Sequence, residues 1–330
     1  MIISRTPFRI SFFGGGTDYP KWFEEHGGVV LSTTIDKYCY ISCRYLPPFF
    51  EHKYRIVYSR IENVESIEQI AHPSVRAVLK TYKSEGGLEI HHDGDLPARS
   101  GLGSSSSFTV GLINVIKALD GHYVSKEKLA SEAIHIEQNV INECVGSQDQ
   151  ISAAFGGFNH IEFMRDSSFQ VSPVILRKER LQDLHKHLML FFTGISRNAS
   201  EIAQSKVENL KSREVELLRI KEMVGEAINI LESKDPISDF GHLLHESWLH
   251  KRSLSSRVSS TAVDEIYDIA KSNGALGGKL LGAGGGGFML LFVPPEHQPT
   301  IIEKLKHLVH VPFEFENTGS RIVLYQPDGF

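Results

Sequence analysis

A stretch rich in glycine and serine, residues 97–108, carries the residue types that suit phosphate binding. It reads PARSGLGSSSSF, and the apolar run that follows, residues 108–119, is long enough for a helix. Glycines let the backbone approach a ligand, and a helix start offers N–H groups and a positive dipole end to an anion. We therefore predict a phosphate-binding loop; the alternative is a flexible Gly-Ser turn.

Carboxylates near this segment could supply acid–base and metal-binding chemistry. Glu137 lies on a predicted helix, and Asp149 follows a bend marked by Gly146. Phosphoryl transfer needs a metal ion, a positioned hydroxyl acceptor and charge compensation, so a carboxylate on each side of one cleft favours that chemistry. Glu143 is a second possible metal ligand. The alternatives are a solvated surface for Glu137 and a helix cap for Asp149.

A cation and a further carboxylate lie near the N-terminus. Arg9 alternates with Phe8 and Ile10 in a strand-like pattern. Three glycines follow a few residues later, and Thr17 and Asp18 come directly after them. Arg9 could offset phosphate charge, and Asp18 could accept hydrogen bonds from a polyol. The alternatives are a surface arginine on a half-exposed strand and ordinary turn chemistry.

A second glycine-rich run, KLLGAGGGGF at residues 279–288, includes four consecutive glycines, which are entropically costly in a folded chain. We expect its backbone to pack against a nucleotide, a substrate or the first glycine loop; a tight turn between strands is the alternative. The literal GxGxxG here precedes FMLLFV, which is typical of a strand, so a dinucleotide fingerprint is excluded. Gly278 and Lys279 resemble the end of a P-loop, but Leu280 stands where a P-loop needs Ser or Thr, so a P-loop is also excluded.

Periodicity predicts the elements that position these residues. Residues 8–12 alternate like a strand that ends at the glycines, and residues 28–43 form a strand or hairpin with Cys39 and Cys43 in the core. Helical patterns cover residues 66–84, 108–119, 125–144 (capped by Ser125), 200–234, 239–273 and 299–308. Strand patterns cover residues 88–92, 188–194, 288–295 and 321–326, with a hairpin at 157–176 and a charged link at 177–187.

This mixture has no regular βαβ rhythm, so it predicts an α+β fold. The 330 residues suit two domains, which we place at residues 1–180 and 181–330. The net charge of −5 offers no field for nucleic acid, and no apolar run suggests a membrane span. Three sparse cysteines and an N-terminus without a signal-peptide pattern lead us to expect a cytoplasmic protein.

Taken together, the motifs resemble a known family. RTPFRISFFGGGTDYP, LPARSGLGSSSSF and KLLGAGGGGF look like the three signature motifs of the GHMP small-molecule kinases, in the same order and across almost the whole chain. Within that family, FGGGTDYP, TGISR at residues 193–197 and ESWLHKRSLS at residues 246–255 are most similar to the D-glycero-α-D-manno-heptose 7-phosphate kinases, which are related to bacterial fucokinases.

The resemblance implies an N-terminal domain like ribosomal protein S5 domain 2, a ferredoxin-like C-terminal domain, and ATP and substrate between them. It implies that Asp149 orients or deprotonates the acceptor hydroxyl and that Arg9 stabilises charge near the transferred group. Mg²⁺ would be held by Ser106 and Glu137, with Glu143 left open because the interval to Asp149 is one residue longer than in mevalonate-kinase-like relatives. The implied ATP-binding residues are Pro97, Ser100, Gly101, Leu102, Gly103, Ser104, Ser105, Ser106 and Ser107.

The resemblance also implies the substrate. Galactokinases carry a Glu-His pair where Gly15 and Gly16 stand, so a larger or differently oriented sugar gains room. The implied activity is ATP-dependent phosphorylation of the anomeric C1 hydroxyl of the heptose 7-phosphate, giving the 1,7-bisphosphate used for GDP-heptose and surface polysaccharide. The alternatives are another sugar-1-kinase, such as an L-fucokinase, and a non-catalytic sensor of nucleotide or sugar. We expect the protein to bind only small molecules and to be a monomer or homodimer. The implied substrate-binding residues are Gly15, Gly16, Thr17, Asp18, Arg197, Lys251, Arg252, Gly284 and Gly285.

Overall fold

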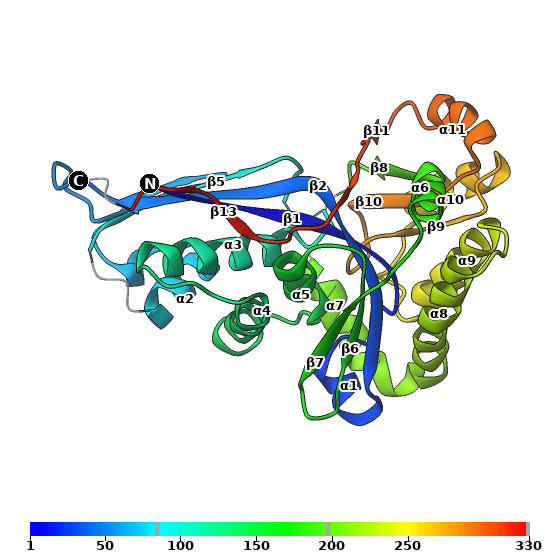
Figure 1. The fold of residues 1–330 in the computed structure, drawn as a ribbon, viewed down its shortest axis with the longest axis horizontal. Helices are drawn as coiled ribbons and strands as arrows, with labels where there is room; N and C mark the ends of the chain where they lie inside the picture. The colour runs from blue at the N-terminus through cyan, green and yellow to red at the C-terminus, as the bar shows by residue number, and fades with distance from the viewer. Residues whose placement is uncertain (83–85, 99, 196–198, 328–330) are drawn as a thin grey trace.

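Two β-sheets organise the chain. The structure is a computed structural model that describes residues 1–82, 86–98, 100–195 and 199–327. Within these residues the larger sheet has nine strands and the smaller has four. Figure 1 shows helices α2, α3 and α4 along one face of the larger sheet, and the smaller sheet beside helix α9, which packs against α8. This mixture confirms the predicted α+β class.

The strands of the larger sheet come from both ends of the chain. They are β1 (Ile2–Phe13), β2 (Gly28–Tyr45), β3 (Tyr54–Val57), β4 (Ile61–Val64), β5 (Leu88–Gly94), β6 (Asn159–Phe163), β7 (Phe169–Pro173), β12 (Phe315–Glu316) and β13 (Arg321–Tyr325). The smaller sheet is antiparallel throughout, in the order β11 (Val309–His310), β8 (Leu188–Phe192), β10 (Phe288–Phe292) and β9 (Gly277–Leu280).

The helices are interspersed among these strands. They are α1 (Pro20–His26), α2 (Pro73–Tyr82), α3 (Ser104–Leu119), α4 (Lys126–His135), α5 (Gln148–Phe155), α6 (Lys178–Lys186), α7 (Ala199–Asn209), α8 (Glu214–Glu232), α9 (Ser238–Ser253), α10 (Thr261–Ser272) and α11 (Gln298–Lys304). Short turns are η1 (Ile67–Gln69), η2 (Ile136–Val140, a π-helical turn), η3 (Leu210–Arg213) and η4 (Pro295–His297). No described helix is both long and apolar enough to cross a membrane.

Strand β2 connects most of the strands of the larger sheet. Its 18 residues form one strand rather than a hairpin, pairing with β1 along its length, with β6 near its start and with β5 near its end. Cys39 and Cys43 are buried on it, as predicted. One continuous strand therefore joins β1, β5 and β6 into a single sheet.

Two of the predicted helices in the first half of the chain are shorter than their sequence patterns, and the segments 200–234 and 239–273 are each divided into two helices. In the segment 66–84, Pro73 restricts the residue before it, so a short turn, η1, precedes α2. In the segment 125–144, Ser125 caps α4 as predicted, accepting a hydrogen bond from the Lys128 N–H at 3.2 Å. Helix α4 then continues into the wider π-helical turn η2, where the helical segment ends. Farther along the chain, the segment 177–187, which we predict as a charged link, contains a helix, α6.

The chain returns to the larger sheet after completing the smaller one. Strand β12 pairs with β2, and β13 pairs with β1. We keep residues 1–180 and 181–330 as a proposed division, in which residues 315–325 of the second half complete the sheet of the first. An aromatic cluster joins the two parts, because Phe240 of α9 contacts Phe12 and Phe13 at the end of β1.

Candidate active site

The predicted phosphate loop leads directly into helix α3. The helix begins at Ser104, so the serines that looked like loop residues form its first turn. Gly101 and Gly103 have φ values of 85° and 75°, in the left-handed region that favours glycine. No side chain caps the helix at Gly103, the residue that precedes its first turn. The helix start is therefore arranged as an anion-binding site.

Arg9 connects this loop to Asp149. Its Nε and Nη2 each donate to one carboxylate oxygen of Asp149 at 2.8 Å, and its Nη1 donates to the Gly101 carbonyl at 2.6 Å. Its backbone N–H donates to the Leu102 carbonyl at 3.0 Å. Arg9 is buried, unlike a surface arginine, and a Cβ at Gly103 would lie 3.5 Å from the Asp149 carboxylate. The structure thus brings three segments distant in sequence into one centre.

Glu137 lies in the π-helical turn η2 and is buried. The Ser106 hydroxyl donates to its Oε2 at 2.8 Å, and the Gln150 amide donates to the same oxygen. Burial raises the pKa of Glu137 to about 7, although hydrogen bonds from Thr109, Ser106 and Gln150 oppose this rise. Its Oε1 is buried without a hydrogen-bond partner among the described residues. A hydroxyl and a carboxylate with an unused oxygen fit a hard cation such as Mg²⁺.

Glu143, the alternative metal ligand, lies just beyond this turn. Its backbone N–H donates to the Glu137 carbonyl at 2.8 Å, and its negative charge contributes to the raised pKa of Glu137. Gln150, in contrast, did not stand out in the sequence. The only signal for Gln150 was its place after Asp149 in SQDQ, which puts it on the first turns of α5.

Asp18 is buried beside the Arg9–Asp149 pair. Its Oδ1 accepts the Gly16 N–H at 2.9 Å, and its Oδ2 accepts the Gln148 amide at 2.8 Å. Burial raises the pKa of Asp18, and the charge of Asp149 acts in the same direction. A Cβ at Gly146 would lie 1.9 Å from Oδ2, so the glycine lets this turn close over the carboxylate.

The neighbouring Thr17 has a structural role. Its hydroxyl donates to the carbonyls of Gly14 and Val29 at 2.8 and 2.9 Å, which closes the turn that presents Asp18. Ser107 acts similarly, because its hydroxyl donates to the Pro7 carbonyl at 2.9 Å and fixes α3 to β1. These two hydroxyls hold the site together.

Two of the predicted sugar-phosphate cations contact groups of the protein itself. Lys251 is buried and donates to the carbonyls of Leu280 and Gly282 at 2.6 and 2.8 Å. Arg252 pairs with Asp264 at 3.0 Å. Arg197 lies outside the described residues.

The second glycine run packs against the first loop, one of the alternatives predicted for it. A Cβ at Gly282 would lie 2.5 Å from the Gly101 Cα, and one at Gly287 would lie 2.1 Å from the Ser100 carbonyl oxygen. Farther along the run, a Cβ at Gly284 would meet the backbone of Val258, whose carbonyl accepts the Gly285 N–H at 2.8 Å. Strand β10 follows the run, as predicted.

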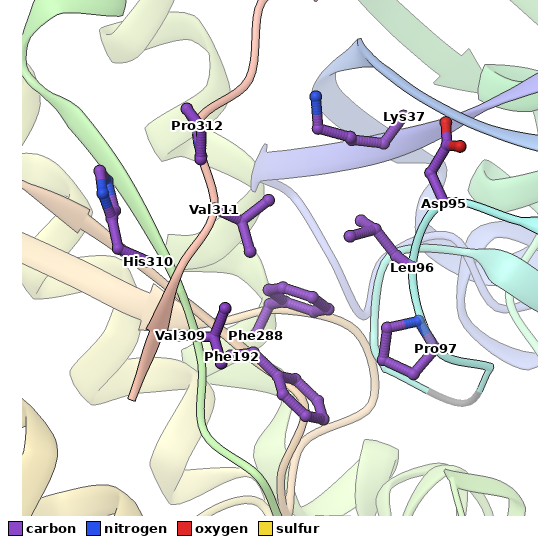
Figure 2. Close-up of a pocket in the computed structure, with 10 residues that line it drawn as sticks. All are labelled: Lys37, Asp95, Leu96, Pro97, Phe192, Phe288, Val309, His310, Val311 and Pro312. Carbon is purple, nitrogen blue, oxygen red and sulfur yellow. The ribbon is translucent and has the colours of Figure 1, made fainter. Parts of the chain in front are cut away.

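A largely apolar cavity of about 390 Å³ lies where the two sheets meet (Figure 2). It borders the phosphate loop through Pro97 and contacts β10 through Phe288. Arg9, Asp149 and Glu137 do not line it, so this cavity is separate from the candidate site that these residues form. Its lining residues are Lys37, Asp95, Leu96, Pro97, Phe192, Phe288, Val309, His310, Val311 and Pro312.

Comparison with known protein families identifies the family to which this chain belongs. Residues 69–157 match the GHMP kinases N terminal domain, and residues 227–310 match the GHMP kinases C terminal domain. The chain belongs to the GHMP kinase family. This GHMP kinase is 31% identical over 319 residues to D-glycero-alpha-D-manno-heptose 7-phosphate kinase of Campylobacter jejuni, with 92% of the chain and 93% of the relative covered.

Two further proteins are informative. The GHMP kinase is 25% identical over 348 residues to the L-fucokinase/L-fucose-1-P guanylyltransferase of Bacteroides fragilis, covering 92% of the chain and 36% of that protein. Its fold matches the crystal structure of a D-glycero-D-manno-heptose 1-phosphate kinase from Bacteroides thetaiotaomicron with a TM-score of 0.80 at 23% identity, covering 98% and 99% of the two chains. The chain is an ATP-dependent small-molecule kinase, and its relatives support a sugar kinase.

Proposed function

We propose that this GHMP kinase transfers the γ-phosphoryl group of ATP to the anomeric C1 hydroxyl of D-glycero-α-D-manno-heptose 7-phosphate. The product would be the 1,7-bisphosphate, a precursor of GDP-heptose for surface polysaccharide. The observation that carries the proposal is the contact of Arg9 with both Asp149 and the phosphate loop. The 31% identity to a heptose 7-phosphate kinase supports this choice of sugar.

In this mechanism Asp149 acts on the acceptor hydroxyl. Its side chain is 26% exposed, so a sugar can reach it, while the two hydrogen bonds from Arg9 fix the plane of the carboxylate. As the acceptor oxygen bonds to the γ-phosphorus, the bond to the β–γ bridging oxygen of ATP breaks and the hydroxyl proton passes to Asp149. The buried positive charge of Arg9 lies beside the loop and offsets charge on the transferred group.

Ser106 and Glu137 are the residues proposed to hold Mg²⁺. When bound, Mg²⁺ neutralises charge on the β- and γ-phosphates. The unused Glu137 Oε1 is available for this contact, and Gln150 and Ser106 orient the carboxylate. On the acceptor side, Asp18 would hold sugar hydroxyls, and Arg197, Lys251 and Arg252 are the cations proposed for the remote phosphate.

A substrate panel tests the proposal. ADP release would be measured with heptose 7-phosphate, heptose 1-phosphate, L-fucose and galactose, and ³¹P NMR would identify the position of the new phosphate. We expect the highest kcat/KM with heptose 7-phosphate and a 1,7-bisphosphate product. Preference for L-fucose would support the fucokinase alternative, and phosphorylation of heptose 1-phosphate would place the transfer at the other end of the sugar. Failure to release ADP with any sugar would support a sensor.

A further inference from the structure

Two polar side chains beside Asp18 have buried atoms without partners. Within the described residues, neither the Gln148 Oε1 nor the Ser11 Oγ has a hydrogen-bond partner, and the two side chains belong to residues that are 8% and 5% exposed. The amide orientation of Gln148 follows from Asp18, because the carboxylate oxygen at 2.8 Å must accept from the amide nitrogen. An unsatisfied buried acceptor is costly, so each of these groups indicates a missing partner.

Gly15 lies beside both of these side chains. Gly14 and Gly16 have φ values of 85° and 112°, which explain their identity, but the φ of Gly15 lies outside the left-handed region. A Cβ at Gly15 would lie 3.6 Å from the Gln148 amide nitrogen and 3.7 Å from the Ser11 Oγ, both ordinary contact distances. Neither the backbone nor the neighbours therefore require glycine at this position. A methyl group at this position would instead lie against the Ser11 Oγ, which has no partner, and against the amide group of Gln148.

We propose that Ser11 and Gln148 form a subsite for one hydroxyl group of the acceptor, above the bare backbone of Gly15. The acceptor hydroxyl donates its hydrogen to the Gln148 Oε1 and accepts the hydrogen of the Ser11 hydroxyl. Gln148 directly precedes Asp149, so the subsite lies next to the residue proposed to act on the reacting hydroxyl. This inference rests on the proposed function, because it requires a polyhydroxylated acceptor.

The subsite makes acceptor binding, and not ATP binding, sensitive to two small substitutions. Ser11→Ala removes one hydrogen bond, and Gly15→Ala adds a methyl group against both side chains, at contact distances that the fold tolerates. We expect each variant to raise the KM for heptose 7-phosphate by about tenfold, with kcat and the KM for ATP within about twofold of the unmodified enzyme. Isothermal titration of heptose 7-phosphate without ATP should show the same loss of affinity.

Monodeoxy analogues of heptose 7-phosphate identify the hydroxyl. One analogue should bind the unmodified enzyme about tenfold more weakly than the parent sugar, and Ser11→Ala should abolish most of that difference. Gln148→Met should also lose the discrimination. Because that change also removes the hydrogen bond to Asp18, Ser11→Ala and Gly15→Ala decide the outcome.

Matched controls separate this role from a structural one. Ser32→Ala deletes a buried hydroxyl directly across from Ser11 on β2 that already has a partner, Ser152 at 3.0 Å. Gln138→Leu removes an amide group on η2 that donates hydrogen bonds to the Val145 carbonyl and the Ser147 hydroxyl, in the turn before α5. Both should leave the acceptor KM within about twofold of its original value.

The outcomes distinguish the two proposals. If the unmodified enzyme phosphorylates heptose 7-phosphate and both Ser11→Ala and Gly15→Ala leave acceptor affinity unchanged, the subsite is wrong and the proposed function stands. If the unmodified enzyme phosphorylates no sugar of the panel, the proposed function and the subsite fail together.

Discussion

Arg9 shows how much of the site depends on the shape of a single side chain. Its guanidinium donates to both oxygens of Asp149 and to the Gly101 carbonyl, so one planar group sets the distance between the acid and the phosphate loop. A lysine has no such fork of donors and could not reproduce all three contacts in the same geometry. The position of Asp149 relative to the loop is thus fixed by side-chain geometry as well as by charge.

The first prediction concerns the carboxylate itself. Asp149→Asn keeps the size of the side chain but removes its capacity to take a proton, so kcat should fall on the order of 10³-fold. ATP affinity, measured by isothermal titration, should stay within about twofold. Asp166→Asn is the control, because Asp166 is exposed and holds only the turn between β6 and β7. Near-normal turnover of Asp149→Asn would mean that another group acts on the acceptor.

The sequence pointed to candidate site residues whose types are unusual in their setting, and not to those whose types are common. Arg9, Asp18 and Asp149 stood beside glycine runs, and the structure places them together. Gln148 and Ser11 are generic polar residues, and their importance depends on atoms left without partners, which only three-dimensional packing reveals. Lys251, which we predict as a ligand-binding cation, also holds the backbone carbonyls of Leu280 and Gly282.

Among the elements, the contact between the two glycine loops determines the geometry of the phosphate site. Alternation and apolar runs correctly predicted β5, β8, β10 and the β6–β7 hairpin. They did not predict the π-helical turn η2 or the short β3–β4 hairpin, because packing rather than local propensity decides such features. From the sequence alone, the approach of Gly282 to Gly101 is likewise only one of several alternatives for the second glycine run.

The second prediction tests that contact. Gly282→Ala places a Cβ 2.5 Å from the Gly101 Cα, so the phosphate loop must move. We expect the KM for ATP to rise at least tenfold and the melting temperature to fall by several degrees. Gly121→Ala is the matched control, since Gly121 has a similar φ of +73° but no atom within 4 Å of the added Cβ. It should lower stability by about 1 kcal/mol and leave the KM for ATP unchanged.

Equal effects of the two substitutions on the KM for ATP would contradict this account. They would show that left-handed strain, and not the contact between the loops, is responsible.

For the whole molecule, an aromatic cluster beside α3 makes stability depend on pH. His72 stacks on Phe108, the residue that follows the serines, with 4.6 Å between ring centroids, and it meets Tyr58 edge-on. Burial lowers the pKa of His72 to about 4, while the charge of Glu62 acts in the opposite direction. The imidazole of His72 is therefore neutral in the folded protein at neutral pH.

The third prediction follows from the sign of that shift. Between pH 6.5 and about 4 the unfolded chain binds a proton at His72 that the folded chain does not, so the free energy of unfolding falls as the pH falls through this range. The contribution is about 1–3 kcal/mol. Urea unfolding at pH 7 and pH 5 should show a smaller difference for His72→Gln than for the unmodified protein.

The exposed His122 provides the comparison for this prediction. His122→Gln should retain the full difference between pH 7 and pH 5, because its side chain lies at the surface in both conditions. If both substitutions change the pH dependence equally, burial of His72 is not its source.

The pairing of β13 with β1 has a consequence for synthesis of the chain. The two strands are separated by about 300 residues, and a ribosome adding 5–20 residues per second needs roughly 15 to 60 s to produce them both. During that interval one edge of β1 has no neighbour, and an open edge is a template for association with other nascent chains. The larger sheet is therefore completed only late in translation, and chaperones that shield the emerging β1 should improve the yield of folded enzyme.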